Sequence, residues 1–207
     1  MIYSFQDNFI LAHITRTGGV SLANTLEFAG VSVKLLGQQH SPLYEAKTIL
    51  GDDFDPMFKA AIVRNPWDRL MSWQSFIAST VLGDVADPEA ISDPDAAHWR
   101  DFDAFVDDML NETAIIDGET RPVFSQVHQL SDANETLLTD YIGRFETYET
   151  SVQTIFEKIG KRMPRIRHEN KSPHHPYTVY YSDAAREMVA EKLALDIATF
   201  GYSFEAS

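Results

Sequence analysis

The chain has 207 residues, of which 44% are hydrophobic and 12% aromatic, as expected for one globular domain with an ordinary buried core. It contains no cysteine, which excludes disulfide bonds, thiolate metal sites and a cysteine nucleophile. The formal net charge of −14 argues against a general nucleic-acid-binding protein, because such a protein needs a basic surface.

The first predicted element is a strand that leads through a glycine-containing turn into a helix. Residues 9–14 are almost all apolar, which is typical of a strand buried on both faces. Apolar residues then recur at helical spacing from Leu22, so we expect a helix whose first turn includes Ser21. Between them, residues 15–21 would direct backbone N–H groups and a helix N-terminus at one spot, and such a spot attracts anions.

This turn admits two interpretations. In the functional one, Arg16 adds a fixed positive charge, and Thr17 and Ser21 add hydroxyl groups around an anion. In the other, the turn is a plain connection between strand and helix, in which Gly18 and Gly19 serve only to make it tight. The turn is not a Walker A loop, since no Gly-Lys-Ser or Gly-Lys-Thr ends it.

The next elements repeat this alternation. Ser41 as N-cap and Pro42 at the first helical position predict a helix directly after His40. Residues 58–63 form the next apolar strand, and Pro66 begins the helix that follows it.

The rest of the chain completes an α/β pattern. Residues 83–97 are rich in acidic residues and are expected to form an exposed loop or lid. Further elements are predicted at residues 101–110 (helix), 140–146 (strand), 150–160 (helix ended by Gly160) and 183–199 (helix). We therefore expect a mainly parallel central sheet flanked by helices, in a single domain over residues 1–207. Ligands bind at the carboxyl ends of strands in such sheets, where both turns lie.

Basic residues are concentrated in residues 158–171 of this acidic chain. The segment is either a solvated loop or a contact for an anionic ligand. Glu169 is the only acidic residue of this segment. Its basic residues are Lys158, Lys161, Arg162, Arg165, Arg167 and Lys171.

The segment VRNPWDRLMSW, residues 63–73, resembles the 3′-phosphate-binding segment of sulfotransferases that use 3′-phosphoadenosine 5′-phosphosulfate (PAPS). In that family an arginine at a strand end and a serine in the following helix hold the 3′-phosphate, and here these are Arg64 and Ser72. A guanidinium and a hydroxyl together suit a phosphate dianion. The opening turn resembles the family's loop for the 5′-phosphosulfate, with Arg16 in place of a lysine and Thr15 in place of a proline.

The resemblance covers nearly the whole chain and is closest to carbohydrate-type (Golgi-like) sulfotransferases and their bacterial relatives, because DYIGRFETYE and the closing segment also match. It implies a P-loop-like sulfotransferase fold, PAPS as the sulfate donor and adenosine 3′,5′-bisphosphate as the product. The residues that it implies for binding PAPS are Arg16, Thr17, Gly18, Gly19, Val20, Ser21, Leu22, Arg64, Ser72, Asn170 and Lys171.

Sulfuryl transfer to a hydroxyl needs a base for the hydroxyl proton. His40 lies between the two turns, where carbohydrate-type enzymes often carry a histidine, and histidine suits this role near neutral pH. We predict His40 and Arg16 as the catalytic residues, with Arg16 stabilising the charge that develops on the leaving group. In the alternative, His40 is a surface or helix-capping residue and the base is His13 or Glu146.

No metal site is expected, because sulfuryl transfer needs no metal and no carboxylate pattern surrounds His168, His174 and His175. The sequence shows no charged-then-apolar leader and no long apolar span, so we expect a cytoplasmic protein without a membrane-spanning segment.

The sequence thus predicts a PAPS-dependent sulfotransferase that acts on a hydroxyl of a sugar or glycolipid and has no nucleic-acid partner. One alternative is a non-catalytic nucleotide-binding relative, for which the Arg16 replacement is the main argument. The other is a P-loop kinase-like phosphotransferase, against which the missing Gly-Lys-Ser/Thr argues.

Overall fold

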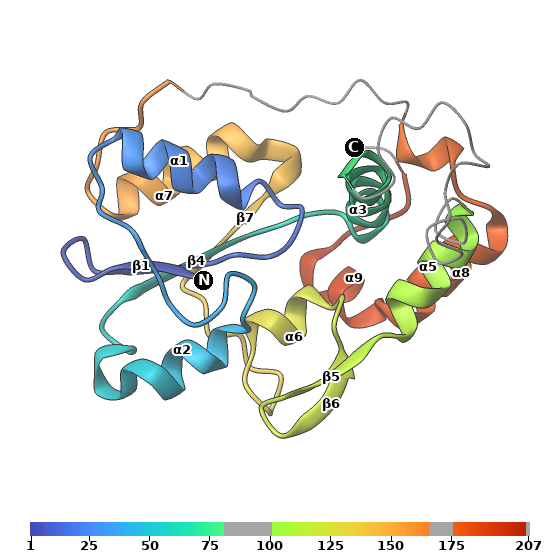
Figure 1. Ribbon diagram of the computed structural model, residues 1–207, viewed down its shortest axis with the longest axis horizontal. Helices are drawn as coiled ribbons and strands as arrows, with labels where there is room; N and C mark the ends of the chain where they lie inside the picture. Colours follow the sequence, from blue (N-terminus) through green and yellow to red (C-terminus); the bar gives the residue numbers. More distant parts are fainter. Residues whose placement is uncertain (81–100, 166–175, 206–207) are drawn as a thin grey trace. The chain divides into compact units, whose positions relative to one another are not determined.

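The computed structural model describes residues 1–80, 101–165 and 176–205 (Figure 1). The acidic segment 83–97 lies outside these ranges, as do Asn170 and Lys171 and the histidines His168, His174 and His175. The chain divides into two compact units. The first consists of the described residues of Met1–Arg64, Ala114–Arg121 and Ser125–Ser172, and the second of those of Asn65–Thr113, Pro122–Phe124 and Pro173–Ser207.

A five-stranded sheet with the strand order β3-β1-β2-β4-β7 forms the centre of the first unit. Its strands are β1 (Ile2–Ser4), β2 (Phe9–Ala12), β3 (Lys34–Leu35), β4 (Phe58–Val63) and β7 (Tyr141–Arg144). β2, β4 and β7 are parallel neighbours, as predicted, whereas β1 is antiparallel to both β2 and β3. The sheet is therefore mixed rather than mainly parallel, because the short turn between β1 and β2 makes them a hairpin.

Helices flank this sheet on both faces. Figure 1 shows α1 (Gly19–Phe28) and α7 (Tyr148–Lys158) on one side and α2 (Leu43–Leu50) on the other. Successive side chains of a strand point to opposite faces, and Ile62 of β4 belongs to the same buried cluster as Leu26 of α1. The smaller elements of the first unit are η1 (Gly51–Asp53), α6 (Gln126–Leu130) and η3 (Phe145–Thr147). The hairpin of β5 (Thr113–Ile116) and β6 (Glu119–Pro122) also belongs to this unit, except for its end residues Thr113 and Pro122.

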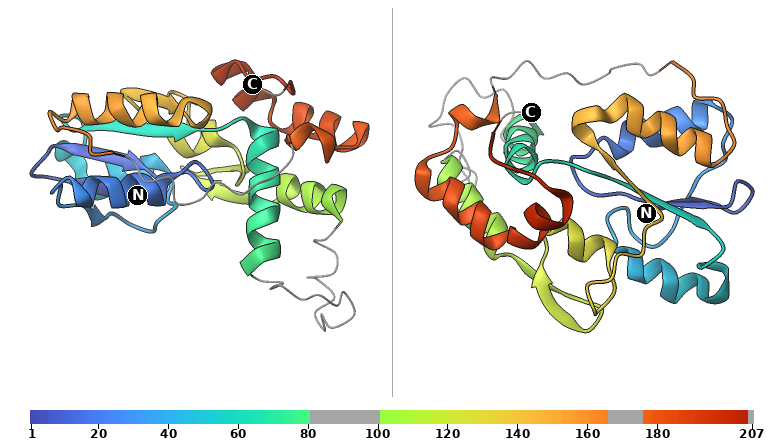
Figure 2. Two further views of the ribbon diagram at one scale, coloured as in Figure 1. Left: turned by 90° about the horizontal axis from the view of Figure 1, so that it is seen from above. Right: turned by 180° about the vertical axis from the view of Figure 1, so that it is seen from behind.

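The described part of the second unit is helical. Its elements are α3 (Pro66–Thr80), α5 (Phe102–Asn111), η4 (Tyr177–Val179), α8 (Asp183–Lys192) and α9 (Ala194–Phe200). α5 and α8 lie side by side (Figure 2), and Leu70, Phe105 and Val189 are buried in one cluster. The helix predicted over residues 183–199 is in fact two helices. The chain leaves the helical conformation at Leu193 (φ −111°, ψ 27°), whose buried side chain joins this core.

The carboxyl ends of the three parallel strands adjoin along one edge of the sheet. In the strand register, Ala12 of β2 pairs with Ala61 of β4, and Val63 of β4 pairs with Arg144 of β7. The loops that follow β2 and β7 therefore begin at the same edge as Arg64, the first residue after β4. This is the edge at which parallel sheets bind ligands.

Candidate functional site

The loop that follows β2 turns sharply into α1. The hydroxyl of Thr17 donates a hydrogen bond of 2.9 Å to the carbonyl of Ile14, which closes the turn. Arg16 (φ 65°) and Gly18 (φ 80°) adopt the left-handed conformation, which is uncommon for a residue with a side chain. Gly18 is the N-cap of α1 and has no side chain with which to cap the helix. The first-turn N–H groups of α1, which start at Gly19 and have no intrahelical acceptor, therefore form the type of helix N-terminus that binds anions.

Two aromatic rings pack directly against the glycines of this loop. Tyr148, the first residue of α7, donates a hydrogen bond of 2.7 Å from its hydroxyl to the carbonyl of Gly18. Its ring fills the space that a Cβ atom at Gly18 would need, and the ring of His13 does the same at Gly19. Both glycines are therefore required by close packing as well as by the tightness of the turn.

Arg64 extends its side chain from the end of β4 to this loop. Its Nη1 donates a hydrogen bond of 3.1 Å to the carbonyl of Arg16, and its guanidinium lies 4.2 Å from the centre of the Phe145 ring. Burial, and then the charge of Arg64, lower the pKa of the Arg16 guanidinium. The Arg64 guanidinium thus lies against the loop that leads into α1, close enough to Arg16 for the two charges to interact.

His40 also lies next to the β2 loop. Its Nδ1 is 2.8 Å from the carbonyl oxygen of His13, and the centres of the two imidazole rings are 4.8 Å apart. A carbonyl can only accept a hydrogen bond, so the neutral tautomer of His40 that makes this bond carries its proton on Nδ1. Its Nε2 is then unprotonated and able to accept a proton.

The helix that follows His40 begins later than predicted. α2 starts at Leu43, and Pro42 rather than Ser41 is its N-cap. The prediction was wrong because the Ser41 hydroxyl turns back and accepts a hydrogen bond of 3.1 Å from the backbone N–H of Gln38. Ser41 therefore stabilises the turn that carries His40 instead of capping the helix.

His13 is a buried histidine that joins the loop to His40. Burial, and then the charge of His40, lower the pKa of His13 to about 4, so the ring is neutral at neutral pH. The side-chain Nε2 of Gln39 lies 3.3 Å from His13 Nδ1. Because an amide NH₂ group can only donate, Nδ1 is the acceptor in this contact. His13 thus has the surroundings of a packing residue.

The other residues predicted for the loop differ in what they expose. Val20 is 57% exposed at the first turn of α1, and Ser21 beside it is partly exposed. The side chain of Leu22 is buried in the core, and its backbone N–H donates to the carbonyl of Gly18. The outward-facing side chains of the first turn are therefore those of Val20 and Ser21, whereas Gly19 and Leu22 are buried.

Several predicted residues lie outside this loop. Ser72 is a buried residue of α3 in the second unit. Glu146 is a partly exposed residue of η3, directly after β7. Asn170 and Lys171 lie outside the described residues.

Sequence reasoning gave no role to Phe145 and Tyr148, although they pack against Arg64 and Gly18. Both stand in the segment FETYE just after β7. The available signal was the position of two aromatic residues at the carboxyl end of a parallel strand, where ligand-binding loops gather.

A comparison with protein-family models decides the family. The model described as "Sulfotransferase family" matches residues 8–203. The chain belongs to the sulfotransferase family. No curated protein and no solved structure matches this sulfotransferase. The family assignment confirms the predicted resemblance to sulfotransferases and implies sulfuryl transfer to a hydroxyl-bearing acceptor.

Two further properties apply to the described part of the sulfotransferase. None of its helices combines the length and apolar character needed to cross a bilayer. Within the same residues, no group of three or more histidines, aspartates and glutamates is arranged to hold a metal ion.

Proposed function

We propose that this sulfotransferase takes its sulfuryl group from PAPS and transfers it to a carbohydrate hydroxyl. The observation that carries the proposal is the pair of guanidinium groups of Arg16 and Arg64 beside the N-terminus of α1. A helix N-terminus and a guanidinium each attract phosphate and sulfate groups. Two such cations at one helix N-terminus suit a ligand with several anionic groups, as PAPS and adenosine 3′,5′-bisphosphate are.

In this proposal the strand–loop–helix of β2 and α1 is a P-loop-like site for the 5′-phosphosulfate. The backbone N–H groups of residues 18–21 and the guanidinium of Arg16 would hold it, and bound PAPS would supply the activated sulfuryl group. Arginine stays charged, so Arg16 stabilises developing negative charge by hydrogen bonding and does not act as an acid.

The 3′-phosphate is assigned to Arg64 and Ser72, following the resemblance of residues 63–73 to the family segment. Arg64 fits the role because its guanidinium is already stacked on Phe145 and bonded to the loop, which reduces the rotamer freedom that binding would otherwise remove. Asn170 and Lys171 are assigned to the nucleotide on the resemblance alone.

His40 is the proposed general base. Its bond to the His13 carbonyl orients the ring and directs the proton to Nδ1, which supports a role for Nε2 in taking the acceptor proton. General base catalysis of this kind contributes about 10²- to 10⁴-fold in rate. A sugar hydroxyl is barely acidic and gains most from such a base, whereas a phenol, with a pKa near 10, needs it less. We therefore favour a sugar or glycolipid acceptor.

Binding of adenosine 3′,5′-bisphosphate tests the cofactor assignment. At 100 times its Kd this ligand should raise the free energy of unfolding by about 2.7 kcal/mol, and at equal concentration adenosine 5′-phosphate and ATP should raise it much less. Thermal unfolding with each ligand measures the difference. Equal shifts with the bisphosphate and with adenosine 5′-phosphate would remove the basis for PAPS.

Catalysis needs a separate assay. Labelled PAPS, incubated with a panel of sugars, glycolipids and phenols, should transfer label to the carbohydrate acceptors. A protein that binds the bisphosphate and transfers no label to any acceptor would be the non-catalytic relative instead.

A further inference from the structure

Gln126, the first residue of α6, makes a pair of hydrogen bonds to a single residue of the site. Its side-chain Oε1 accepts a bond of 2.9 Å from the backbone N–H of Arg64, and its Nε2 donates a bond of 2.9 Å to the backbone carbonyl of Arg64. The Gln126 residue is 0% exposed. The completely buried Gln126 carboxamide thus donates one hydrogen bond to the backbone of Arg64 and accepts one from it.

The need for these bonds follows from where β4 ends. The pairing of β4 with β7 stops at Val63, and its pairing with β2 stops at Ala61. Arg64 is the next residue and is itself buried, so its backbone N–H and carbonyl require hydrogen-bond partners beyond the last pair of the strand register. The Gln126 carboxamide takes the place of a strand neighbour for this residue. It thereby fixes the backbone direction from which the Arg64 side chain departs.

The far end of Arg64 is held as well, by the ring of Phe145 and by the carbonyl of Arg16. We propose that Gln126 is a positioning residue that aims the Arg64 guanidinium at the 3′-phosphate and so gives the protein its preference for 3′-phosphorylated nucleotides. This inference rests on the proposed function. Beyond that function, it identifies Gln126 as the residue that makes Arg64 selective for the 3′-phosphate instead of a general positive charge.

The neighbouring strand provides a matched control. The Ser151 hydroxyl accepts a bond of 2.8 Å from the backbone N–H of Arg144 and donates one of 2.8 Å to its carbonyl. Ser151 is also buried, and Arg144 is the last residue of β7. Gln126 and Ser151 therefore satisfy the backbone at the ends of adjacent parallel strands, and the arginine that Gln126 holds is the one whose side chain bonds to the carbonyl of Arg16 in the β2 loop.

The experiment measures the ratio of two affinities in each variant: the Kd of adenosine 5′-phosphate divided by the Kd of adenosine 3′,5′-bisphosphate, by calorimetry on folded protein. Gln126→Met should lower this ratio about tenfold or more, because small misplacements of a positioning contact have effects of this size. Gln126→Glu keeps the acceptor for the Arg64 N–H and should lower the ratio by a smaller factor. If Gln126→Met does not fold, Gln126→Glu alone provides the test. Ser151→Ala should lose stability and keep the wild-type ratio.

The ratio separates positioning from general stability, since a purely structural role would weaken both ligands equally. A wild-type ratio in both Gln126 variants, or an equal loss of the ratio in Ser151→Ala, would overturn the inference while PAPS binding by the wild type still stands. A wild-type protein that binds both ligands equally would instead refute the proposed function, and the inference with it.

Discussion

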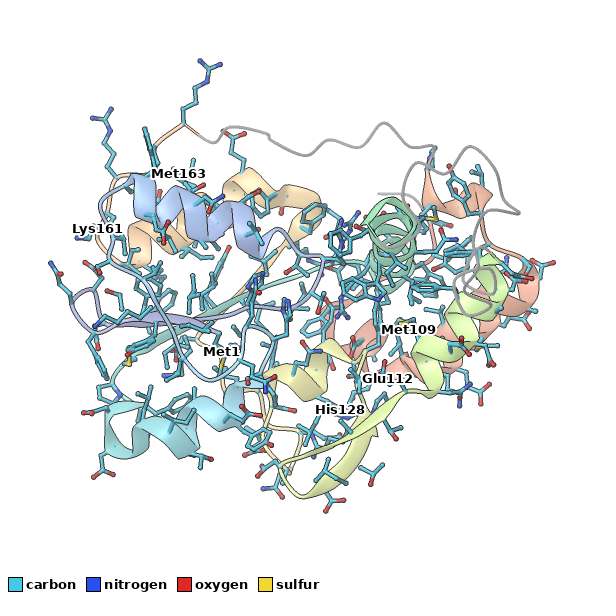
Figure 3. All side chains as sticks on the ribbon, in the orientation of Figure 1. Met1, Met109, Glu112, His128, Lys161 and Met163 are labelled. Carbon is cyan, nitrogen blue, oxygen red and sulfur yellow. The ribbon has the colours of Figure 1, made fainter. Side chains whose placement is uncertain are left out.

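The amino and carboxyl ends of the parallel strands differ in the contacts of their basic residues. At the amino edge, the Nζ of Lys59 lies 3.1 Å from Asp140 Oδ2, and the Nζ of Lys161, beside the turn between β1 and β2, lies 2.7 Å from Asp7 Oδ1 (Figure 3). Each of these lysines meets a carboxylate of the same unit. These two lysines at the amino ends of the strands are therefore paired within the unit.

At the carboxyl edge, positive charge accumulates instead. Arg16 and Arg64 lie close enough for the charge of one to lower the pKa of the other, although the chain as a whole carries a net charge of −14. Like charges repel each other, and an anion bound between them would reduce that repulsion. This end of the strands is where we propose that the phosphosulfate binds.

A cavity also lies at the amino edge. It has a volume of about 410 Å³, and its lining includes Asp7, Asp55 and Asp140. The lining also includes Lys158, and Asp7 and Asp140 are paired with lysines, so the cavity carries charges of both signs.

The comparison predicts that changes at the carboxyl edge reduce catalysis, and the largest effect is expected at His40. His40→Ala should lower kcat with a sugar acceptor by about 10²- to 10⁴-fold. The Kd of adenosine 3′,5′-bisphosphate should change little, because His40 is assigned to the acceptor side. Steady-state kinetics and calorimetry on the same preparation measure the two effects. Full activity in this variant would move the base to Glu146 or His13.

The second effect concerns stability at low pH and arises from His13. The folded-state pKa of His13 is lowered to about 4, below the unfolded value of about 6.5, so the unfolded chain binds the proton more tightly. The stabilisation is therefore fully present above pH 6.5 and is lost as the pH falls to 4. At about 1.4 kcal/mol for each pKa unit, the loss is about 3 kcal/mol. Urea titrations between pH 4 and 7 should show this slope in the wild type and a reduced slope in His13→Gln; equal slopes would show that another group is responsible.

The third effect tests whether the charge of Arg16 acts mainly in the transition state. Arg16→Ala should lower kcat about 100-fold and weaken bisphosphate binding much less, since electrostatic contacts to developing charge act on the rate. Arg16→Lys should retain activity, because lysine keeps the charge and is the residue at this position of the family loop. An unchanged kcat in Arg16→Ala would mean that the loop only positions the ligand.

The smallest effect belongs to the amino edge. Asp140 Oδ2 accepts a hydrogen bond of 2.7 Å from the Lys59 backbone N–H and also pairs with the Lys59 ammonium. Asp140→Asn should lower the free energy of unfolding by about 1 kcal/mol, because the Asp140 side chain is half-exposed and its ion pair is screened. Its kcat should equal that of the wild type, and a reduced kcat would break the distinction between the two edges.

Local sequence patterns predicted the elements that form the carboxyl edge. The apolar runs at residues 9–14 and 58–63 gave β2 and β4 because a strand buried on both faces needs consecutive apolar residues. β1 was missed because it has only three residues. The hairpin of β5 and β6 was also missed, although Asp117-Gly118 between its strands is a dipeptide typical of tight hairpin turns.

The site itself was predicted only where its residues are neighbours in sequence. Arg16 and Gly18 stand out in the turn, but the Tyr148 hydroxyl reaches Gly18 from 130 residues away, and Gln126 bonds to Arg64 across 62 residues. No periodicity or capping pattern in either segment specifies such a partner. These contacts depend on which strands become neighbours, and that is decided by packing of the whole sheet.

The contact between His13 and Gly19 links the evolution of these two positions. The imidazole ring occupies the volume in which a side chain at position 19 would begin, so a residue larger than glycine can appear there only if position 13 first becomes smaller. A smaller residue at position 13 would in turn leave a hole beside His40. Either single step costs stability, and sequences that diverge from this one should therefore change the two positions together or keep both.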